Sequence, residues 1–164
     1  MADDRWRPSV TVAAVIERDG RFLLVEEDTF EGLRLNNPAG HLDPGESPLQ
    51  AVVRETLEET AHAFSPSAIV GLYLSRFTRP ARGEDVTYLR IAFAGSVGDR
   101  IAGRALDTGI RRTLWLTAAE MHAEAARMRS PLVLRCLDDF LAGRRYPLDL
   151  LATDPSVYVP EVRG

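Results

Sequence analysis

The residues best suited to chemistry are three glutamates, Glu55, Glu58 and Glu59, in the stretch GHLDPGESPLQAVVRETLEE that runs from Gly40 to Glu59. On an α-helix, their i, i+3, i+4 spacing places the carboxylates within roughly a 100° arc. Like charges at these separations repel by roughly 0.2–0.5 kcal/mol per pair, so the cluster is unfavourable unless it binds a cation. Magnesium prefers carboxylate oxygens and often binds substrate phosphates at the same time. The glutamates are therefore either a phosphate-bridging magnesium site or the solvated face of a surface helix, and spacing alone favours the solvated face.

The helix that would carry these glutamates has a clear start in the sequence. Ser47 suits the N-cap, Pro48 the first helical position and Gln50 the third, and Ser47 with Gln50 makes a capping box. Apolar residues then recur every four positions, at Leu49, Val53 and Leu57. We therefore expect a helix that buries this stripe and turns the glutamates to the opposite side.

The same stretch resembles the Nudix box, G-x5-E-x7-R-E-U-x-E-E-x-G-U, where U is a bulky apolar residue. The positions in register are Gly40, Glu46, Arg54, Glu55, Glu58 and Glu59, with Thr56 at the first U. Ala61 replaces the last glycine, and His62 replaces the last apolar residue. Because a glycine there normally permits a left-handed turn at the helix end, we expect the helix to continue past Ala61 towards Phe64.

The resemblance also implies roles for individual residues. Glu55, Glu58 and Glu59 would bind Mg²⁺, or Mn²⁺ in its place, together with the backbone carbonyl of Gly40 or Ala39. The catalytic residues would be Glu59, Glu58 and Arg54, with Arg54 orienting a neighbouring glutamate through an ion pair. Glu46 would support the loop before the helix. The general base varies within the family, so a box glutamate, Asp107 and Glu84 all remain candidates.

Three arginines outside the box are candidates for binding substrate phosphates. Arg79 and Arg82 lie in the polar segment 78–85, which we expect to be an exposed loop, and Arg90 lies in a predicted strand. Ordinary loop charges are an equally good interpretation of the first two. His62 and His122 have no partner in the sequence, and we expect both at the surface.

The elements that must position these residues are strands and helices interspersed along the chain. We expect strands at 10–17, 22–25, 68–77, 86–97 and 112–116, with irregular chain over 27–45. Capping signals predict further helices from Thr117 to about Met128 and from Ser130-Pro131 to Gly143. The tail from about Arg144 should be irregular. The predicted fold class is α/β (α+β), a mixed sheet covered by helices, and the resemblance implies a Nudix-like α/β/α sandwich.

Length and composition limit the classes of protein to which the chain can belong. The 164 residues predict a single domain over 1–164, and the net charge of −4 argues against a nucleic-acid binder. Cys136 is the single cysteine, which excludes an intrachain disulfide and fits a reducing cytoplasm. There is no signal peptide by pattern, and no apolar run approaches the roughly 18 residues of a membrane helix.

The likeness extends beyond the box to one subgroup, the NudJ-type phosphatases. It is carried by the segments 36–42, 129–133 and 145–148, whereas Leu35 stands where a tryptophan is expected. It implies hydrolysis of nucleoside di- or triphosphates or of the diphosphate of the thiamine pyrimidine precursor, by a monomer or homodimer. Three alternatives stay open: a nucleotide-sanitising enzyme that releases pyrophosphate, a sugar-nucleotide enzyme, and a non-catalytic nucleotide-binding module.

Overall fold

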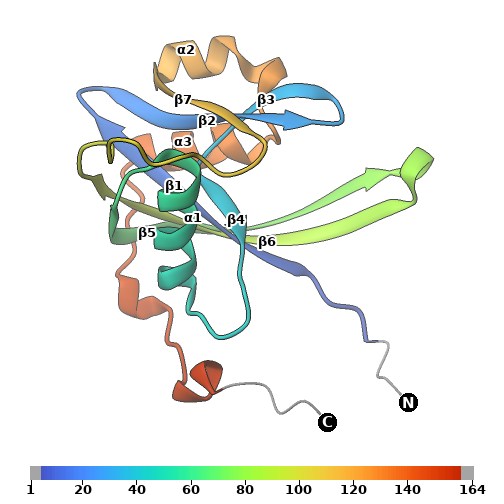
Figure 1. The fold of residues 1–164 in the computed structure, drawn as a ribbon. Helices are drawn as coiled ribbons and strands as arrows, with labels where there is room; N and C mark the ends of the chain where they lie inside the picture. The colour runs from blue at the N-terminus through green and yellow to red at the C-terminus, as the bar shows by residue number, and fades with distance from the viewer. Residues whose placement is uncertain (1–4, 160–164) are drawn as a thin grey trace.

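A computed structural model describes residues 5–159 of the chain (Figure 1). The strands are β1 (Ser9–Arg18), β2 (Arg21–Thr29), β3 (Gly32–Asn36), β4 (Ala39–His41), β5 (Phe64–Arg79), β6 (Glu84–Val97) and β7 (Ile110–Thr117). The helices are α1 (Pro48–Thr60), α2 (Ala118–Ala123) and α3 (Leu132–Leu141), with short 3-10 turns at Pro80–Arg82, Ala125–Arg127, Leu148–Leu150 and Pro155–Tyr158. Over this part of the chain, no helix has the length and apolar character needed to cross a membrane.

The strands form one mixed sheet in the order β3-β2-β1-β6-β5, with β4 pairing β1 and β7 pairing β2. β1 lies at the centre and runs parallel to β6, while the other pairs are antiparallel. The run from Val12 to Ile16 is buried on both sides, which confirms that this apolar segment is a central strand.

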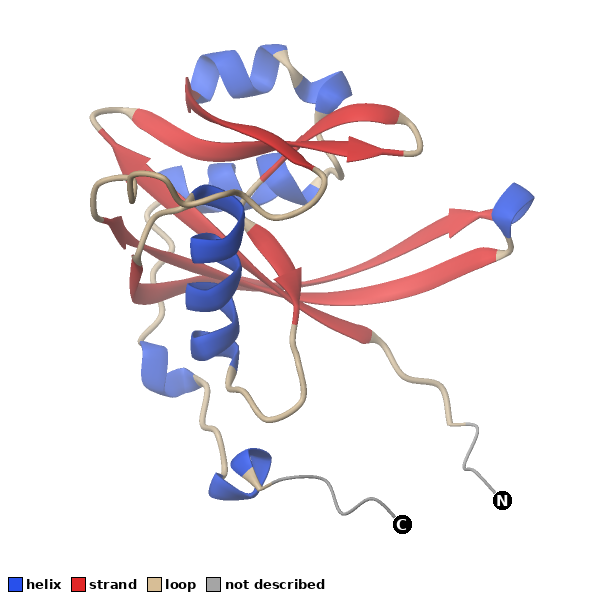
Figure 2. Cartoon of the chain, in the orientation of Figure 1, coloured by secondary structure: helices blue, strands red, loops and turns tan. Residues whose placement is uncertain are grey.

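Helices cover both faces of the sheet (Figure 2), so the predicted fold class is confirmed. On one face, α1 packs through Ala51 and Val52 against Val12 and Phe93. On the other face, α3 packs through Val133 and Leu137, in the same core as Met121 of α2. Cys136 of α3 is fully buried.

Helix α1 begins as predicted, and both hydrogen bonds of the Ser47–Gln50 capping box are present. The predicted stripe is only partly buried: Leu49 and Val53 pack against the core, but these two and Leu57 are half-buried. The buried side chains are instead Ala51, Val52, Thr56, Glu59 and Thr60. The glutamate face therefore lies partly against the rest of the protein, where a regular amphipathic helix would place apolar residues.

The end of α1 also differs from the prediction. Ala61 itself adopts the left-handed conformation, with φ 58° and ψ 28°, and the helix stops at Thr60. The connection between β6 and β7 then crosses the helix end, where Ile101 N–H donates to Ala61 O (2.8 Å) and Asp107 N–H to Glu58 O (2.9 Å). These bonds satisfy carbonyls that a helix end leaves free. They hold the backbone turn without a glycine.

Several segments predicted as irregular or exposed are ordered structure. The span 27–45 contains the end of β2, all of β3 and β4, while 78–85 continues the β5–β6 pairing up to a tight turn. α2 ends at Ala123, short of the predicted Met128. His62 is 4% exposed, contrary to prediction, and its Nδ1 lies 2.8 Å from Thr60 O.

Candidate active site

The Nudix-box residues meet where the short strand β4 lies beside α1. Glu59 Oε2 accepts a hydrogen bond from Ala39 N–H at 3.0 Å. The Glu55 carboxylate lies directly over Gly40, so closely that a Cβ on residue 40 would overlap it. Since the backbone conformation of Gly40 is ordinary, a larger residue here would act by displacing the Glu55 carboxylate. Two of the three helix carboxylates thus lie against neighbouring residues of β4, Glu59 against Ala39 and Glu55 against Gly40.

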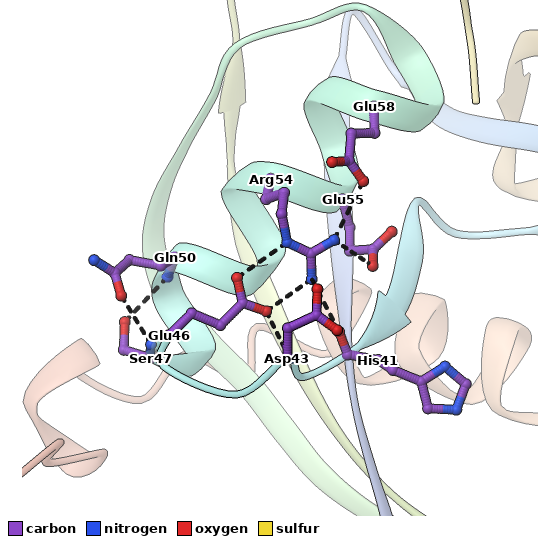
Figure 3. A network of polar contacts seen from close by, with 8 residues as sticks. All are labelled: His41, Asp43, Glu46, Ser47, Gln50, Arg54, Glu55 and Glu58. Atoms are coloured by element: carbon purple, nitrogen blue, oxygen red, sulfur yellow. Dashed lines mark hydrogen bonds and ion pairs between the residues drawn. The ribbon is translucent and has the colours of Figure 1, made fainter. Parts of the chain in front are cut away.

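Arg54 connects the helix to the loop that precedes it (Figure 3). Its guanidinium donates to both oxygens of Glu46, at 3.0 and 2.7 Å, and to His41 O at 3.0 Å. Its Nη1 also contacts Glu55 (2.8 Å) and Glu58 (3.2 Å). Hydrogen bonding from Arg54 holds the pKa of Glu46 below its usual value despite partial burial. This bidentate pair fixes the loop against α1.

Glu59 is the most deeply placed of the three carboxylates, with 7% of its surface exposed. Burial raises its pKa to about 8; the Ala39 N–H opposes this, and the charges of Glu55, Glu27 and Asp107 add to it. Burial also raises the pKa of Glu55, although the Arg54 hydrogen bond acts in the other direction. A bound cation would stabilise the ionised forms of carboxylates placed this close together in a desolvated site.

The donor set fits a hard divalent cation. Carboxylates of Glu55, Glu58 and Glu59 and the backbone carbonyls of Ala39 and Gly40 supply oxygen ligands alone, as magnesium prefers. Within residues 5–159, however, no three His, Cys, Asp or Glu side chains are already arranged around one ion position. Glu55 and Glu58 contact Arg54, and Glu59 contacts Ala39 N–H. For all three glutamates to hold one ion, Glu58, whose side chain is 40% exposed, would have to leave Arg54.

A second polar group lies beyond β4: it contains Arg90, a candidate from the sequence, and two asparagines that the sequence analysis did not single out for a role. Arg90 of β6 is 7% exposed, and its Nη1 and Nη2 donate at 3.3 Å to the side-chain oxygens of Asn37 and Asn36. Asn36 Nδ2 donates in turn to Glu27 at 3.3 Å. The signal was available, since Asn36 and Asn37 directly precede the Pro38-Ala39-Gly40 segment. Their amides place Arg90 next to the box loop.

Of the other residues that the sequence suggested for binding or catalysis, Asp107 lies near the site, whereas Arg79, Arg82 and Glu84 lie at a distant hairpin tip. Arg79 and Arg82 both pair with Glu84 at 3.1 Å, at the tip of the β5–β6 hairpin. Arg79 also lies 3.6 Å from Glu31, and Arg82 stacks on Phe30 with 3.6 Å between guanidinium carbon and ring centre. These arginines therefore join two hairpin tips. Asp107, in contrast, is bonded through its backbone to Glu58, and its charge acts on Glu59.

Comparisons with known proteins agree with this geometry. A profile of the NUDIX domain matches residues 5–136. Phosphatase NudJ of Escherichia coli (strain K12) is 34% identical over 147 residues, covering 89% of this chain and 92% of that protein. A solved NUDIX hydrolase from Nitrosomonas europaea is 49% identical, with a TM-score of 0.83, over 90% of this chain and 98% of its own.

A more distant likeness concerns the fold alone. The MutT NUDIX hydrolase from Burkholderia pseudomallei is 20% identical, with a TM-score of 0.61, and the match covers 82% of this chain and 98% of that one. Members of this family act on small phosphorylated substrates and generally need a divalent metal. With its box carboxylates gathered at β4 and relatives similar over nearly its whole length, this chain belongs to the Nudix hydrolases.

Proposed function

We propose that this enzyme hydrolyses a phosphoanhydride bond of a nucleoside di- or triphosphate, or of a small organic diphosphate, and releases orthophosphate. The observation that carries the proposal is the convergence of Glu55 and Glu59 on Ala39 and Gly40. Similarity to the phosphatases named NudJ supports orthophosphate over pyrophosphate as the product. A reducing cytoplasm, in which the buried Cys136 stays a thiol, is the compartment we propose.

In this proposal, some residues bind the metal ion or the substrate phosphate, and others fix the position of the loop that precedes α1. Glu55, Glu58 and Glu59 would hold Mg²⁺, which when bound neutralises phosphate oxygens and acidifies water. Arg54 and Glu46 keep the β4–α1 loop fixed against the helix, so that the Ala39 and Gly40 carbonyls stay at one place. Arg90, oriented by Asn36 and Asn37, supplies positive charge to a substrate phosphate.

The proton acceptor for the attacking water must lie within hydrogen-bond reach of it. Glu59 and Asp107 are the candidates near the site, because Asp107 acts on Glu59 through its charge and lies on the segment bonded to Glu58. Glu84 is paired with two arginines at a hairpin tip. We therefore propose that the base comes from α1 or from the β6–β7 connection.

The test is a panel of nucleoside di- and triphosphates and small organic diphosphates, assayed with Mg²⁺ and with separate detection of phosphate and pyrophosphate. We expect orthophosphate from at least one of these substrates and complete loss of turnover in EDTA, restored by excess Mg²⁺ or Mn²⁺. Pyrophosphate as the sole inorganic product would indicate the sanitising type instead. Tight nucleotide binding in calorimetry, without product, would indicate a binding module and would contradict the proposal.

A further inference from the structure

Two adjacent glutamates on β2 have different surroundings. Successive strand residues point to opposite faces of a sheet. Glu26 is 4% exposed and is held by two arginines, with Arg112 Nε at 2.9 Å and Arg127 as the second partner. The two arginines therefore balance the negative charge of Glu26. Glu27 points to the other face, and the register between β2 and β7 shifts between these two residues. Such irregularities often redirect a side chain.

Glu27 is held from one side only. Its Oε1 accepts from Asn36 Nδ2 at 3.3 Å and lies 3.6 Å from Arg129 Nε. Asn36 is oriented in turn by Arg90, which donates to its side-chain oxygen. Across residues 5–159, Glu27 Oε2 accepts no hydrogen bond, although the side chain is only 19% exposed. Glu27 is therefore an oriented and largely buried carboxylate, and its Oε2 is available to accept a hydrogen bond.

A chain of hydrogen bonds, from Glu27 through Asn36 and Arg90 to Asn37, connects this carboxylate to the segment that leads into β4. Asn36, its neighbour in the hydrogen-bond chain, is three residues before Ala39, whose N–H contacts Glu59. Pro38 between them is fixed by its carbonyl, which accepts from Ala14 N–H at 2.9 Å. The charge of Glu27 also contributes to the raised pKa of Glu59, which places the two carboxylates within electrostatic range. A substrate whose phosphates lie at Gly40 could therefore reach Glu27 with its organic group.

The chemistry of Glu27 limits what it can bind there. An ionised carboxylate only accepts hydrogen bonds, and it repels phosphate. Arg129 and Arg90 already supply positive charge beside it, so a neutral donor is sufficient as a partner. Building on the proposed function, we propose that Glu27 determines specificity by accepting a hydrogen bond at Oε2 from the organic group of the substrate. The donor would be the amino group of a base or the hydroxyl of a sugar.

The experiment uses substrate pairs that differ in the donor at one position. CTP against UTP and ATP against ITP exchange an amino group for an oxo group, with the adjacent ring nitrogen carrying a hydrogen in UTP and ITP, and CTP against dCTP removes a hydroxyl. Tripolyphosphate, which has no organic group, is the donor-free probe. We measure kcat/KM with Mg²⁺ for the wild type, for Glu27→Gln, and for Glu26→Gln as the matched control one residue away. The same pairs are also compared by their dissociation constants in calorimetry with EDTA present.

We expect the wild type to favour the donor-bearing member of at least one pair by about tenfold, as for a hydrogen bond to a charged group. Glu27→Gln, which can donate to an oxo group, should bring that ratio to within about twofold of unity. Glu26→Gln should keep the wild-type ratio, and tripolyphosphate hydrolysis should change by less than about twofold in both variants. The pair that responds identifies whether the donor is on the base or on the sugar.

Three results would overturn the inference. The first is a wild type that shows no preference within any pair, and the second is a preference that Glu27→Gln leaves unchanged. The third is a loss of tripolyphosphate hydrolysis in Glu27→Gln as large as the loss with nucleotides, because Glu27 would then act on the phosphates. Failure of the proposed function is distinguishable: the wild type would hydrolyse nothing, while the ratios of dissociation constants would still report on Glu27.

Discussion

Within residues 5–159, Glu59 is a buried carboxyl group without a cationic partner, since its hydrogen bond comes from the Ala39 backbone. We predict that Glu59→Gln lowers kcat/KM by at least about two orders of magnitude. The metal-free protein should become more stable by about 1 kcal/mol at pH 7, or roughly 2–4 °C in Tm, because the amide oxygen keeps the Ala39 contact and removes the cost of burying a carboxyl whose pKa is raised. Phosphate release with Mg²⁺ and scanning calorimetry in EDTA measure the two effects.

Glu58→Gln is the matched control for this prediction. The Glu58 side chain is 40% exposed and contacts Arg54, so its neutralisation should give no gain in metal-free stability. Retained turnover in a folded Glu59→Gln protein, or a metal-free variant less stable than the wild type, would contradict the role given to Glu59.

Through Glu26, the free energy of unfolding should depend on pH in the acid range. The Arg112 hydrogen bond is the largest influence on its pKa; burial opposes it, Arg127 adds to it, and the pKa is lowered from 4.5. A carboxyl with a lowered folded-state pKa stabilises the fold above its unfolded-state pKa, and this contribution is lost as pH falls through the folded-state value. Glu26→Gln should therefore cost about 2 kcal/mol at pH 7, below the range for a fully buried pair because Arg112 is largely exposed.

Urea unfolding of the wild type and of Glu26→Gln between pH 7 and pH 3 tests this directly. The difference in the free energy of unfolding should be constant down to about pH 5 and should shrink below pH 4.5. If the difference stayed constant down to pH 3, the charge of Glu26 would not be what stabilises the wild type relative to Glu26→Gln.

The residues of the box could be predicted from the sequence because glycine and charged residues at fixed positions require no knowledge of distant contacts. The role of Glu27 could not, since it depends on Asn36 on the neighbouring strand and on Arg129 about a hundred positions away. Arg79 and Arg82 show what residue type alone leaves undetermined. Their charges are suited to phosphate, but they pair with Glu31, Glu84 and Phe30, which only the fold brings together.

At the scale of elements, the end of α1 depends on Ala61 in a left-handed conformation that costs an L-residue roughly 1–2 kcal/mol. Ala61→Gly removes this strain. It also loses a fully buried methyl group, worth roughly 0.8 kcal/mol, and adds roughly 0.4–1 kcal/mol of unfolded-state entropy. The effects nearly cancel, so we predict a change in the free energy of unfolding below about 0.5 kcal/mol.

Ala61→Val serves as the comparison, because a β-branched residue is strongly disfavoured at positive φ and has no room here. It should cost more than about 2 kcal/mol in urea unfolding. A large stabilisation by glycine would mean that the β6–β7 connection does not hold this turn.

The long, strongly patterned elements were predictable, and the short ones were not. β1, β5, β6 and the start of α1 follow from apolar runs and a capping box. β3 and β4 lie among glycine, proline and asparagine and have few residues, so local preference is weak. Pairing to β2 and β1 makes them strands. The buried face of α1 was misjudged because carboxylates that face β4 cannot be told from solvated ones by periodicity.

On the scale of the whole molecule, a mixed sheet covered by helices followed from the alternation of strand and helix signals. The arrangement of the two long hairpins did not. Figure 1 shows the β5–β6 hairpin projecting from the body of the protein, below the β2–β3 hairpin. Their tips meet through Arg82 on Phe30 and Arg79 beside Glu31. Contacts between positions about fifty apart, at exposed turns, leave no periodic trace in a sequence.

This contact between tips couples the local opening of the two hairpins. A guanidinium on an exposed ring contributes roughly 0.5–1 kcal/mol. Arg82→Ala should therefore speed amide hydrogen exchange by up to about fivefold, both around residue 82 and around Phe30 on the other hairpin. Arg76→Ala, which breaks an exposed pair within β5–β6 alone, should leave exchange at Phe30 unchanged. Opening of the β2–β3 hairpin, which begins with the strand of Glu27, would then be coupled to opening of the β5–β6 hairpin, which ends with the strand of Arg90.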